Sequence, residues 1–299
     1  MKSRMSTVHF VFAVALATVF SVIGSPATAQ EGPLKPFKDE LFSKQTILEK
    51  ADNGDYEIVD YQEMRDINGR DREPEMHVRS QYIDTAVRSV QEDQALVFGD
   101  RKLNVTRVGQ AEGEAFVVIF IHGRGGDRRL GVDDQKFGGN FNRLKNLVVR
   151  NGGTYYSVSV PAFDDKGAAD VGALIRYAFE QAAGRPVILA CASMGGILCQ
   201  HITRDKETVR YMAGMVLLGG PPDPGLPTTP FVKLGLPIYF AHGSADKVYA
   251  AQDQIDIYRK LHLAKYPVRF TLFATGSHGT PIRMVDWRKV LNFVLVAHR

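Results

Sequence analysis

Three residues whose side chains can carry out acyl chemistry together follow three separate apolar segments of the chain. Ser193 lies in ILACASMGG, Asp246 in HGSADKVY and His278 in GSHG. A serine hydroxyl is a weak nucleophile until a neighbouring base removes its proton, and a carboxylate can orient that base and stabilise its charged form. The order serine, aspartate, histidine therefore predicts Ser193 as the nucleophile, His278 as the general base and Asp246 as the group that holds the base.

Each of these residues also has a plainer interpretation. A serine between a strand and a helix is a common helix N-cap, a histidine in a glycine-rich loop is often a surface residue, and an aspartate at a strand end is often a cap. Asp223, in GGPPDPG, is an alternative orienting acid because it follows the preceding apolar segment. His122 and His242 also end apolar segments, and we expect structural roles for both.

From residue 96 onward, apolar segments alternate with helical patterns, as in an α/β protein with a parallel sheet. Two short strands around a Gly-Asp turn begin this part. The later apolar segments are continuous, which indicates strands that helices cover on both faces. The later strands are predicted within 114–126, 154–163, 185–193, 211–220, 236–246 and 268–279, and the helices within 140–153, 164–184, 194–205, 250–264 and 284–299. In open sheets of this kind, catalytic groups gather at the carboxyl ends of the strands.

The turn around Ser193, the acid loop HGSADKV and the histidine loop GSHG resemble those of the α/β-hydrolase superfamily. The resemblance covers roughly residues 96–299 and implies the α/β-hydrolase fold, a mostly parallel central sheet with helices on both faces. IHGRGGDR matches the superfamily's oxyanion loop, so the resemblance implies that the backbone N–H groups of Arg124 and Met194 bind the oxyanion of a tetrahedral intermediate. Cys191 stands where the usual Gly-x-Ser-x-Gly pattern has its first glycine. The segment PPDPGLPTTPFVKLG is too short for an inserted cap domain.

With this resemblance, the chain is predicted to be a serine hydrolase that cleaves carboxylic esters through an acyl-enzyme intermediate. Its expected partner is a small-molecule or lipid-like acyl ester. A peptidase, an acyltransferase and a catalytically inactive binding module are the alternatives, because a fold does not select among these functions. The arginines of the oxyanion loop, Arg124, Arg128 and Arg129, form either a site for an anionic substrate or a solvated face.

Residues 1–29 are predicted to be a secretory signal peptide. Lys2 and Arg4 precede an apolar run, and the small residues that follow it fit cleavage after Ala29. We therefore expect a periplasmic or secreted protein with no membrane span after cleavage.

Residues 30–95 are predicted to be an N-terminal extension of the catalytic domain at 96–299. The extension is expected either to pack behind the sheet or to form a partial lid. Short amphipathic helices are expected at 40–52 and 78–92.

Composition and cysteine count narrow the remaining possibilities. The 299 residues include 37 Lys and Arg and 33 Asp and Glu, a formal net charge of +4, without the clustered basic face of a nucleic-acid-binding protein. Scattered histidines and the lack of a dinucleotide fingerprint predict no metal and no cofactor. Cys191 and Cys199 are expected to be buried free thiols, because strand–helix packing would hold their backbones about 10 Å apart. A disulfide requires Cα atoms within roughly 7 Å.

Overall fold

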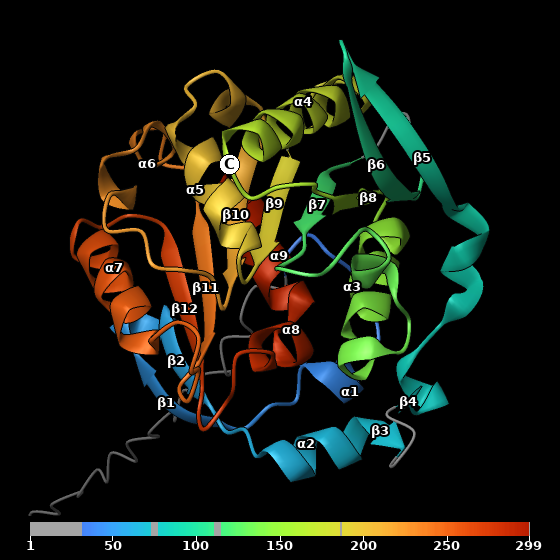
Figure 1. Ribbon diagram of the computed structural model, residues 1–299. Helices are drawn as coiled ribbons and strands as arrows, with labels where there is room; N and C mark the ends of the chain where they lie inside the picture. The colour runs from blue at the N-terminus through green and yellow to red at the C-terminus, as the bar shows by residue number, and fades with distance from the viewer. Residues whose placement is uncertain (1–31, 73–76, 111–114, 186, 299) are drawn as a thin grey trace, which may run out of the picture. The chain divides into compact units, whose positions relative to one another are not determined.

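The computed structural model describes residues 32–72, 77–110, 115–185 and 187–298, and these residues form one large mixed sheet (Figure 1). Within the described residues its ten strands lie in the order β1-β2-β12-β11-β10-β9-β7-β8-β6-β5. Neighbours from β2 to β8 are parallel, whereas β1, β6 and β5 pair antiparallel at the two edges. The mostly parallel sheet predicted from the sequence is confirmed.

The strands of the large sheet are β1 (Ile47–Ala51), β2 (Tyr56–Val59), β5 (Gln91–Phe98), β6 (Arg101–Val108), β7 (Val117–Ile121), β8 (Thr154–Ser159), β9 (Val187–Ala192), β10 (Met212–Leu218), β11 (Ile238–Gly243) and β12 (Val268–Phe273). A separate pair joins β3 (Asp71–Arg72) and β4 (His77–Val78). The helices are α1 (Asp39–Phe42), α2 (Glu63–Arg70), α3 (Asn140–Arg150), α4 (Asp165–Gln181), α5 (Gly195–Arg204), α6 (Pro230–Lys233), α7 (Ala251–Leu263), α8 (Thr280–Met284) and α9 (Trp287–Ala297). The 3-10 turns are η1 (Asp52–Gly54), η2 (Ser80–Tyr82), η3 (Thr85–Val90), η4 (Leu130–Val132), η5 (Lys136–Gly139), η6 (Thr208–Tyr211) and η7 (Leu226–Thr228).

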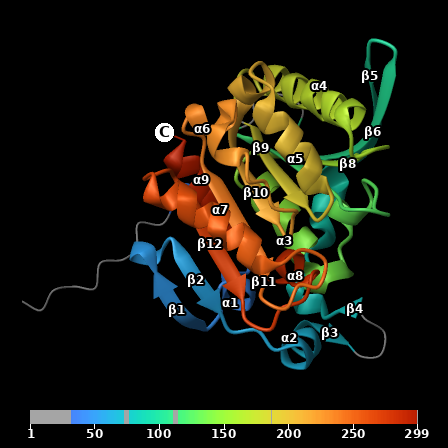
Figure 2. The ribbon, with the colours of Figure 1, turned by 60° about the vertical axis from the view of Figure 1, so that its left-hand side comes forward.

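Helices cover both faces of the large sheet, as the continuously apolar strands predict. The face in front in Figure 2 carries α4, α5 and α7, whose buried side chains form one core cluster with strand residues. The opposite face carries α3, α8 and α9, which belong to a second cluster. Because both faces are covered, every residue of β7, β9, β10 and β11 is buried. Between β10 and β11 the chain forms only η7 and the four-residue α6, so no cap domain is inserted there.

Local sequence explains where several of these helices begin and which side they bury. The side chains of Asp164, Thr229 and Asp286 accept hydrogen bonds from backbone N–H groups at the starts of α4, α6 and α9, which satisfies donors that a helix leaves unpaired. The buried apolar residues of α3 recur every three or four positions and turn one face toward the sheet: Phe141, Leu144, Leu147 and Val148.

The N-terminal extension supplies β1, β2 and the first part of β5, which crosses the predicted boundary at residue 95. The helix expected at 40–52 is wrong for most of its length. Only α1 is helical, and β1 follows it. β1 pairs with β2, and β2 pairs in parallel with β12, with Tyr56 opposite Phe270. The edge of β12 offers backbone hydrogen bonds to this segment, and such tertiary context overrides a weak local helix preference.

The helix expected at 78–92 is also wrong, because this segment forms β4, two 3-10 turns and the start of β5. Two side chains of α3 bond to the backbone of Asp84. Asn142 accepts from its N–H (2.9 Å) and donates to its carbonyl (3.0 Å), and Asn146 donates to the same carbonyl (2.9 Å). These bonds occupy backbone groups that a continuous α-helix would need for itself.

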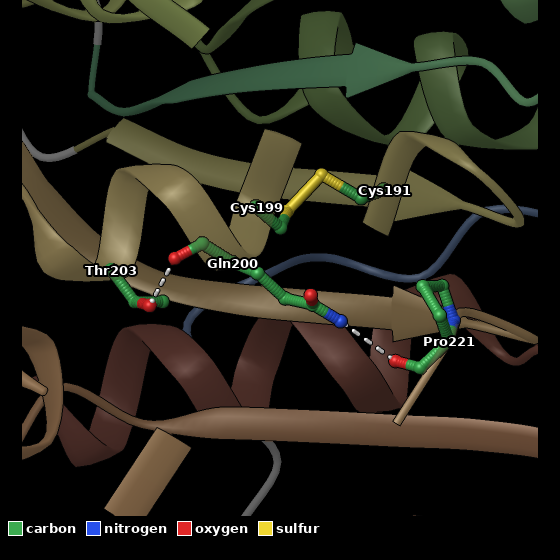
Figure 3. Close-up of a disulfide and its surroundings, with 5 residues drawn as sticks. All are labelled: Cys191, Cys199, Gln200, Thr203 and Pro221. Carbon is green, nitrogen blue, oxygen red and sulfur yellow. Dashed lines mark hydrogen bonds between the residues drawn. A yellow bond between two sulfur atoms is a disulfide. The ribbon is translucent and has the colours of Figure 1, made fainter. Parts of the chain in front are cut away.

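The expectation of two free thiols is wrong, because Cys191 and Cys199 form a disulfide (Figure 3). Their Cα atoms lie 6.5 Å apart, within the range that a disulfide can bridge. The expected separation assumed a helix packed flat across the sheet. Instead α5 begins at Gly195, three residues after β9 ends, so its first turns lie close to the end of that strand.

Two sequence predictions concern membranes and export. Within the ranges that the structure describes, no helix combines the length and the apolar character needed to cross a bilayer. The predicted signal peptide at 1–29 lies outside the described residues.

A buried arginine ties the extension to the helices behind the sheet. Arg143 of α3 is fully buried, and its guanidinium forms ion pairs with Asp39 of α1 (3.0 Å) and Asp286, the cap of α9 (2.9 Å). It also donates to Ser43 Oγ (2.8 Å) and lies over the Phe42 ring (4.9 Å). Removal of residues 30–95 would therefore leave a buried cation without most of its partners, as well as an unpaired edge on β12.

Arg143→Ala is expected to destabilise the fold by about 3–5 kcal/mol, because breaking a buried ion-pair network is costly. Asp286 and Ser43 lose the guanidinium, and Asp39 keeps its ion pair with Arg288. Chemical denaturation of the purified chain measures this free energy. Arg129→Ala is the matched control, since Arg129 is exposed and pairs with Asp127 at the surface; its denaturation midpoint should hardly change. Equal midpoints for both variants would contradict the assigned role of Arg143.

Candidate active site

The three residues singled out by their chemistry follow strands that lie near one another in the sheet. Ser193 follows β9, Asp246 follows β11 and His278 follows β12. The sheet order places β10 between β9 and β11, with β12 beside β11, and all four strands are parallel. Their carboxyl ends therefore meet at one edge of the sheet, where open α/β sheets place their ligands.

Ser193 occupies a strained turn between β9 and α5. Its backbone has a φ of +50°, a left-handed conformation that residues other than glycine adopt only when the surroundings hold them there. Its N–H donates to the carbonyl of Leu218 at the end of β10 (3.0 Å). This conformation identifies the turn as more than an ordinary helix N-cap, since a capping residue has extended backbone angles.

Glycines make room for this turn. A Cβ at Gly123 would lie 2.8 Å from Ser193 Cβ, and a Cβ at Gly195 would lie 2.6 Å from the carbonyl oxygen of His122. A Cβ at Gly196 would lie 2.9 Å from Cδ of Pro221. Any side chain at these positions would push the turn away from its neighbours, so the pattern of small residues around Ser193 reflects close packing on three sides.

His278 connects the other two residues. Its Nε2 lies 2.8 Å from Ser193 Oγ, and its Nδ1 lies 2.8 Å from Asp246 Oδ2. An ionised carboxylate can only accept, so Nδ1 carries the proton that faces Asp246, and Nε2 is left to accept the hydroxyl proton of Ser193. The arrangement can thus deprotonate the serine during an attack on an electrophile.

The Asp246 side chain is completely buried and surrounded by donors. Oδ1 accepts from the backbone N–H groups of Val248 (2.8 Å) and Tyr249 (3.2 Å), and Oδ2 accepts from His278. Burial alone would raise the pKa of this carboxyl, but the hydrogen bonds from His278, Val248 and Tyr249 outweigh it and hold the pKa below its ordinary value. Asp246 is therefore ionised at neutral pH and can stabilise a positive charge on His278.

His242 is a further neighbour of this carboxylate. It is buried, and its Nε2 lies 3.2 Å from Asp246 Oδ2 and 3.0 Å from the Tyr249 carbonyl. Both neighbours are acceptors, so Nε2 carries the proton. Burial lowers the pKa of His242, which keeps this histidine neutral at pH 7. The structure thus places His242 against the orienting acid and away from direct contact with Ser193.

Asp223, the alternative acid, lies elsewhere. Its carboxylate receives two hydrogen bonds from the guanidinium of Arg204 in α5 (2.9 and 2.7 Å). The acid that the structure brings to His278 is Asp246.

The predicted oxyanion loop lies beside Ser193, as the contact of Gly123 shows. His122, which precedes it, has a structural role. Its Nε2 accepts from the N–H of Val160 (3.2 Å), so its Nδ1 carries the proton and donates to the carbonyl of Gly123 (2.7 Å). Burial lowers the pKa of His122. The loop is thereby fixed next to the nucleophile, and the oxyanion roles of the Arg124 and Met194 N–H groups remain predictions.

Two arginines of this loop face carboxylates. Arg128 pairs with Asp93 of β5 (2.9 Å), and Arg129 pairs with Asp127 (2.5 Å). These pairs favour the interpretation of a solvated face over an anion site for Arg128 and Arg129.

Two further neighbours of His278, Tyr249 and Gly219, were not predicted from the sequence, because neither is a residue type that itself indicates catalysis. The ring of Tyr249 meets the imidazole edge to face, with centroids 5.7 Å apart. A Cβ at Gly219 would lie 3.2 Å from the carbonyl of His278 and 3.7 Å from Asp246 Oδ2. The loop after β10 therefore packs directly against the histidine loop. In the described part of the chain, no three His, Cys, Asp or Glu side chains gather in a way that could hold a metal ion.

Comparison with known proteins agrees with this fold. The sequence model of the alpha/beta hydrolase family matches residues 118–298. Among curated proteins, no sequence matches this chain significantly.

Solved structures with the same fold are distant in sequence. A thermostable esterase shares 15% identity at a TM-score of 0.56 over 70% of this chain and 64% of its own. A serine hydrolase without a lid from Xanthomonas campestris shares 16% identity at 0.52 over 69% and 94%. A thermophilic esterase from the Planctomycetes species Thermogutta terrifontis, solved with propionate bound, shares 12% identity at 0.52 over 69% and 94%. At these identities the likeness concerns the fold.

Asp246→Asn is expected to slow the reaction of Ser193 with a fluorophosphonate probe by about 10⁴-fold, because the amide no longer stabilises the charged base and favours the wrong histidine tautomer. Asp223→Asn is the matched control and should react at the unmodified rate. Stopped labelling reactions read by mass spectrometry give both rates, with melting temperatures to verify folding. If Asp223→Asn were the slow variant, the assignment of the acid would be reversed.

Proposed function

Because the chain belongs to the alpha/beta hydrolase family, we propose that it is a serine hydrolase that cleaves carboxylic esters through an acyl-enzyme intermediate. The observation that carries this proposal is the unbroken line of two 2.8 Å contacts from Ser193 Oγ through His278 to the buried carboxylate of Asp246. The strained backbone of Ser193 supports it, since such strain is concentrated at functional sites.

In the proposed reaction, Ser193 Oγ attacks the acyl carbonyl carbon while its proton passes to His278 Nε2. Asp246 stabilises the resulting imidazolium, and the backbone N–H groups of Arg124 and Met194 bind the negative oxygen of the tetrahedral intermediate. The intermediate collapses, and the leaving alcohol takes the proton from His278. A water molecule then attacks the acyl carbon while one of its protons passes to His278. The second tetrahedral intermediate collapses, the carboxylic acid leaves, and His278 returns the proton to Ser193 Oγ.

The first test is labelling of the purified chain with a fluorophosphonate probe. The serine oxygen should displace fluoride from phosphorus, and mass spectrometry should place the adduct on Ser193. His278→Ala is expected to abolish the adduct because the serine then lacks its base. Ser80→Ala, at an exposed serine, is the matched control and should keep the adduct.

Turnover of an acyl-ester series tests the reaction itself. Ser193→Ala is expected to lower kcat for the best ester by around a millionfold, because the nucleophile and its base act as a unit. A folded chain that takes no label and turns over no ester would contradict the proposed enzyme and favour a binding module. Faster cleavage of amides would identify a peptidase, and acyl products on an added alcohol would identify an acyltransferase.

We further propose that the protein is exported and works in the periplasm or outside the cell. The signal-peptide pattern of residues 1–29 motivates this proposal, and the Cys191–Cys199 disulfide supports it, because disulfides persist in oxidising compartments.

Expression of the full sequence in a Gram-negative host should give a mature chain in the periplasm. Its intact mass should match a chain that begins at Gln30. The same chain without residues 2–29 should stay in the cytoplasm. Recovery of the full sequence in the cytoplasm with an unprocessed N-terminus would contradict export.

A further inference from the structure

The Cys191–Cys199 disulfide closes a loop that contains Ser193. Cys191 lies in β9 two residues before the serine, and Cys199 lies in α5, so the cross-link spans the strained turn (Figure 3). Both cysteines are completely buried. We propose that this disulfide, together with Gln200, forms an elbow brace that positions Ser193 against His278. The inference rests on the proposed function and names positioning residues for it.

The first arm of the brace fixes where α5 begins relative to the end of β9. Two residues, Ser193 and Met194, connect the two elements, and Ser193 has a φ of +50°. A residue held in this region relaxes unless its surroundings prevent it. The disulfide joins the chain on both sides of the strained residue. Relaxation of the serine backbone would move α5 relative to β9, and the disulfide opposes this movement. It also fixes the start of α5 beside Met194, whose N–H is predicted to bind the oxyanion.

The second arm begins at the neighbouring residue. Gln200 Nε2 donates to the carbonyl of Pro221 (2.9 Å), and the Gln200 carbonyl accepts from Thr203 Oγ1 (2.7 Å) (Figure 3). Gly219, Gly220 and Pro221 form the start of the loop after β10. The same proline lies against α5 at Gly196, where a Cβ would lie 2.9 Å from its Cδ.

This loop supports the base. A Cβ at Gly219 would lie 3.2 Å from the carbonyl of His278 and 3.7 Å from its Nδ1. Gln200 thus ties the helix that follows the nucleophile to the loop under the histidine. The two arms together fix the distance between Ser193 Oγ and His278 Nε2, which come from segments 85 residues apart in the sequence.

The test compares second-order rate constants for fluorophosphonate labelling of Ser193. The double variant Cys191→Ala/Cys199→Ala removes the first arm without leaving a reactive thiol. Gln200→Glu removes the donor of the second arm at nearly unchanged shape and leaves the disulfide intact. Each is expected to label about ten to a hundred times more slowly, since displacement of a reacting group by about 1 Å can cost two orders of magnitude.

A stability-matched control separates positioning from folding. Leu261→Ala creates a cavity in α7, within the same core cluster but outside the brace. Labelling is measured at a temperature where near-ultraviolet circular dichroism shows every variant folded. Leu261→Ala should label at the unmodified rate despite its lower melting temperature. With the best ester substrate, the brace variants should lose kcat at nearly constant KM.

The outcomes distinguish the two proposals. If the unmodified chain takes no label on Ser193, the proposed function fails and the brace fails with it. If the unmodified chain labels and both brace variants label equally fast, the brace alone is overturned. If the double cysteine variant does not fold, Gln200→Glu decides: slow labelling supports the brace, and an unchanged rate overturns it. Equal slowing in Leu261→Ala would also overturn it, because lower stability would then explain the effect.

Discussion

The hydrogen bond between His278 and the buried carboxylate of Asp246 is the interaction on which the candidate site depends. A buried carboxylate is costly unless donors surround it, and here two backbone N–H groups and two histidines do so. Those donors come from the loop after β11, from β11 itself and from the loop after β12. The charge of Asp246 therefore holds these segments together, and the same bond leaves Nε2 of His278 free to face Ser193.

The outer parts of the fold keep these segments in place. β1 and β2 extend the sheet beyond β12, the strand that carries His278 at its end, so this strand is not an open edge. Arg143 joins α1 to the cap of α9 behind the same strands. The N-terminal extension, which carries no part of the catalytic pattern in the sequence, thus helps to support the site. Its removal would therefore disturb the fold.

The sequence predicted those features that depend on local pattern. The strand–helix alternation follows from short-range periodicity, and the candidate residues fall at strand ends that parallel topology brings together. The sequence did not predict β1 or β2, because β2 forms through pairing with β12, more than 200 residues away, and β1 then pairs with β2. Strand-end position alone did not separate Asp246 from Asp223, and the match of HGSADKV to the acid loop of the superfamily favoured Asp246. In the structure Asp246 bonds to His278, whereas Asp223 pairs with Arg204.

The prediction of free cysteines was wrong because the packing of α5 on β9 is also not visible in the sequence pattern. A separation of about 10 Å applies where a helix packs across a strand, but α5 begins three residues after β9 ends, and the Cα atoms of Cys191 and Cys199 lie 6.5 Å apart. The turn that follows position 191 is crowded, since a side chain at Gly123, Gly195 or Gly196 would clash with neighbouring atoms, and cysteine is a small residue. Cysteine also offers a bond that glycine cannot make. The replacement of the usual glycine is therefore consistent with the close packing around Ser193, and it places a covalent link at the strained part of the site.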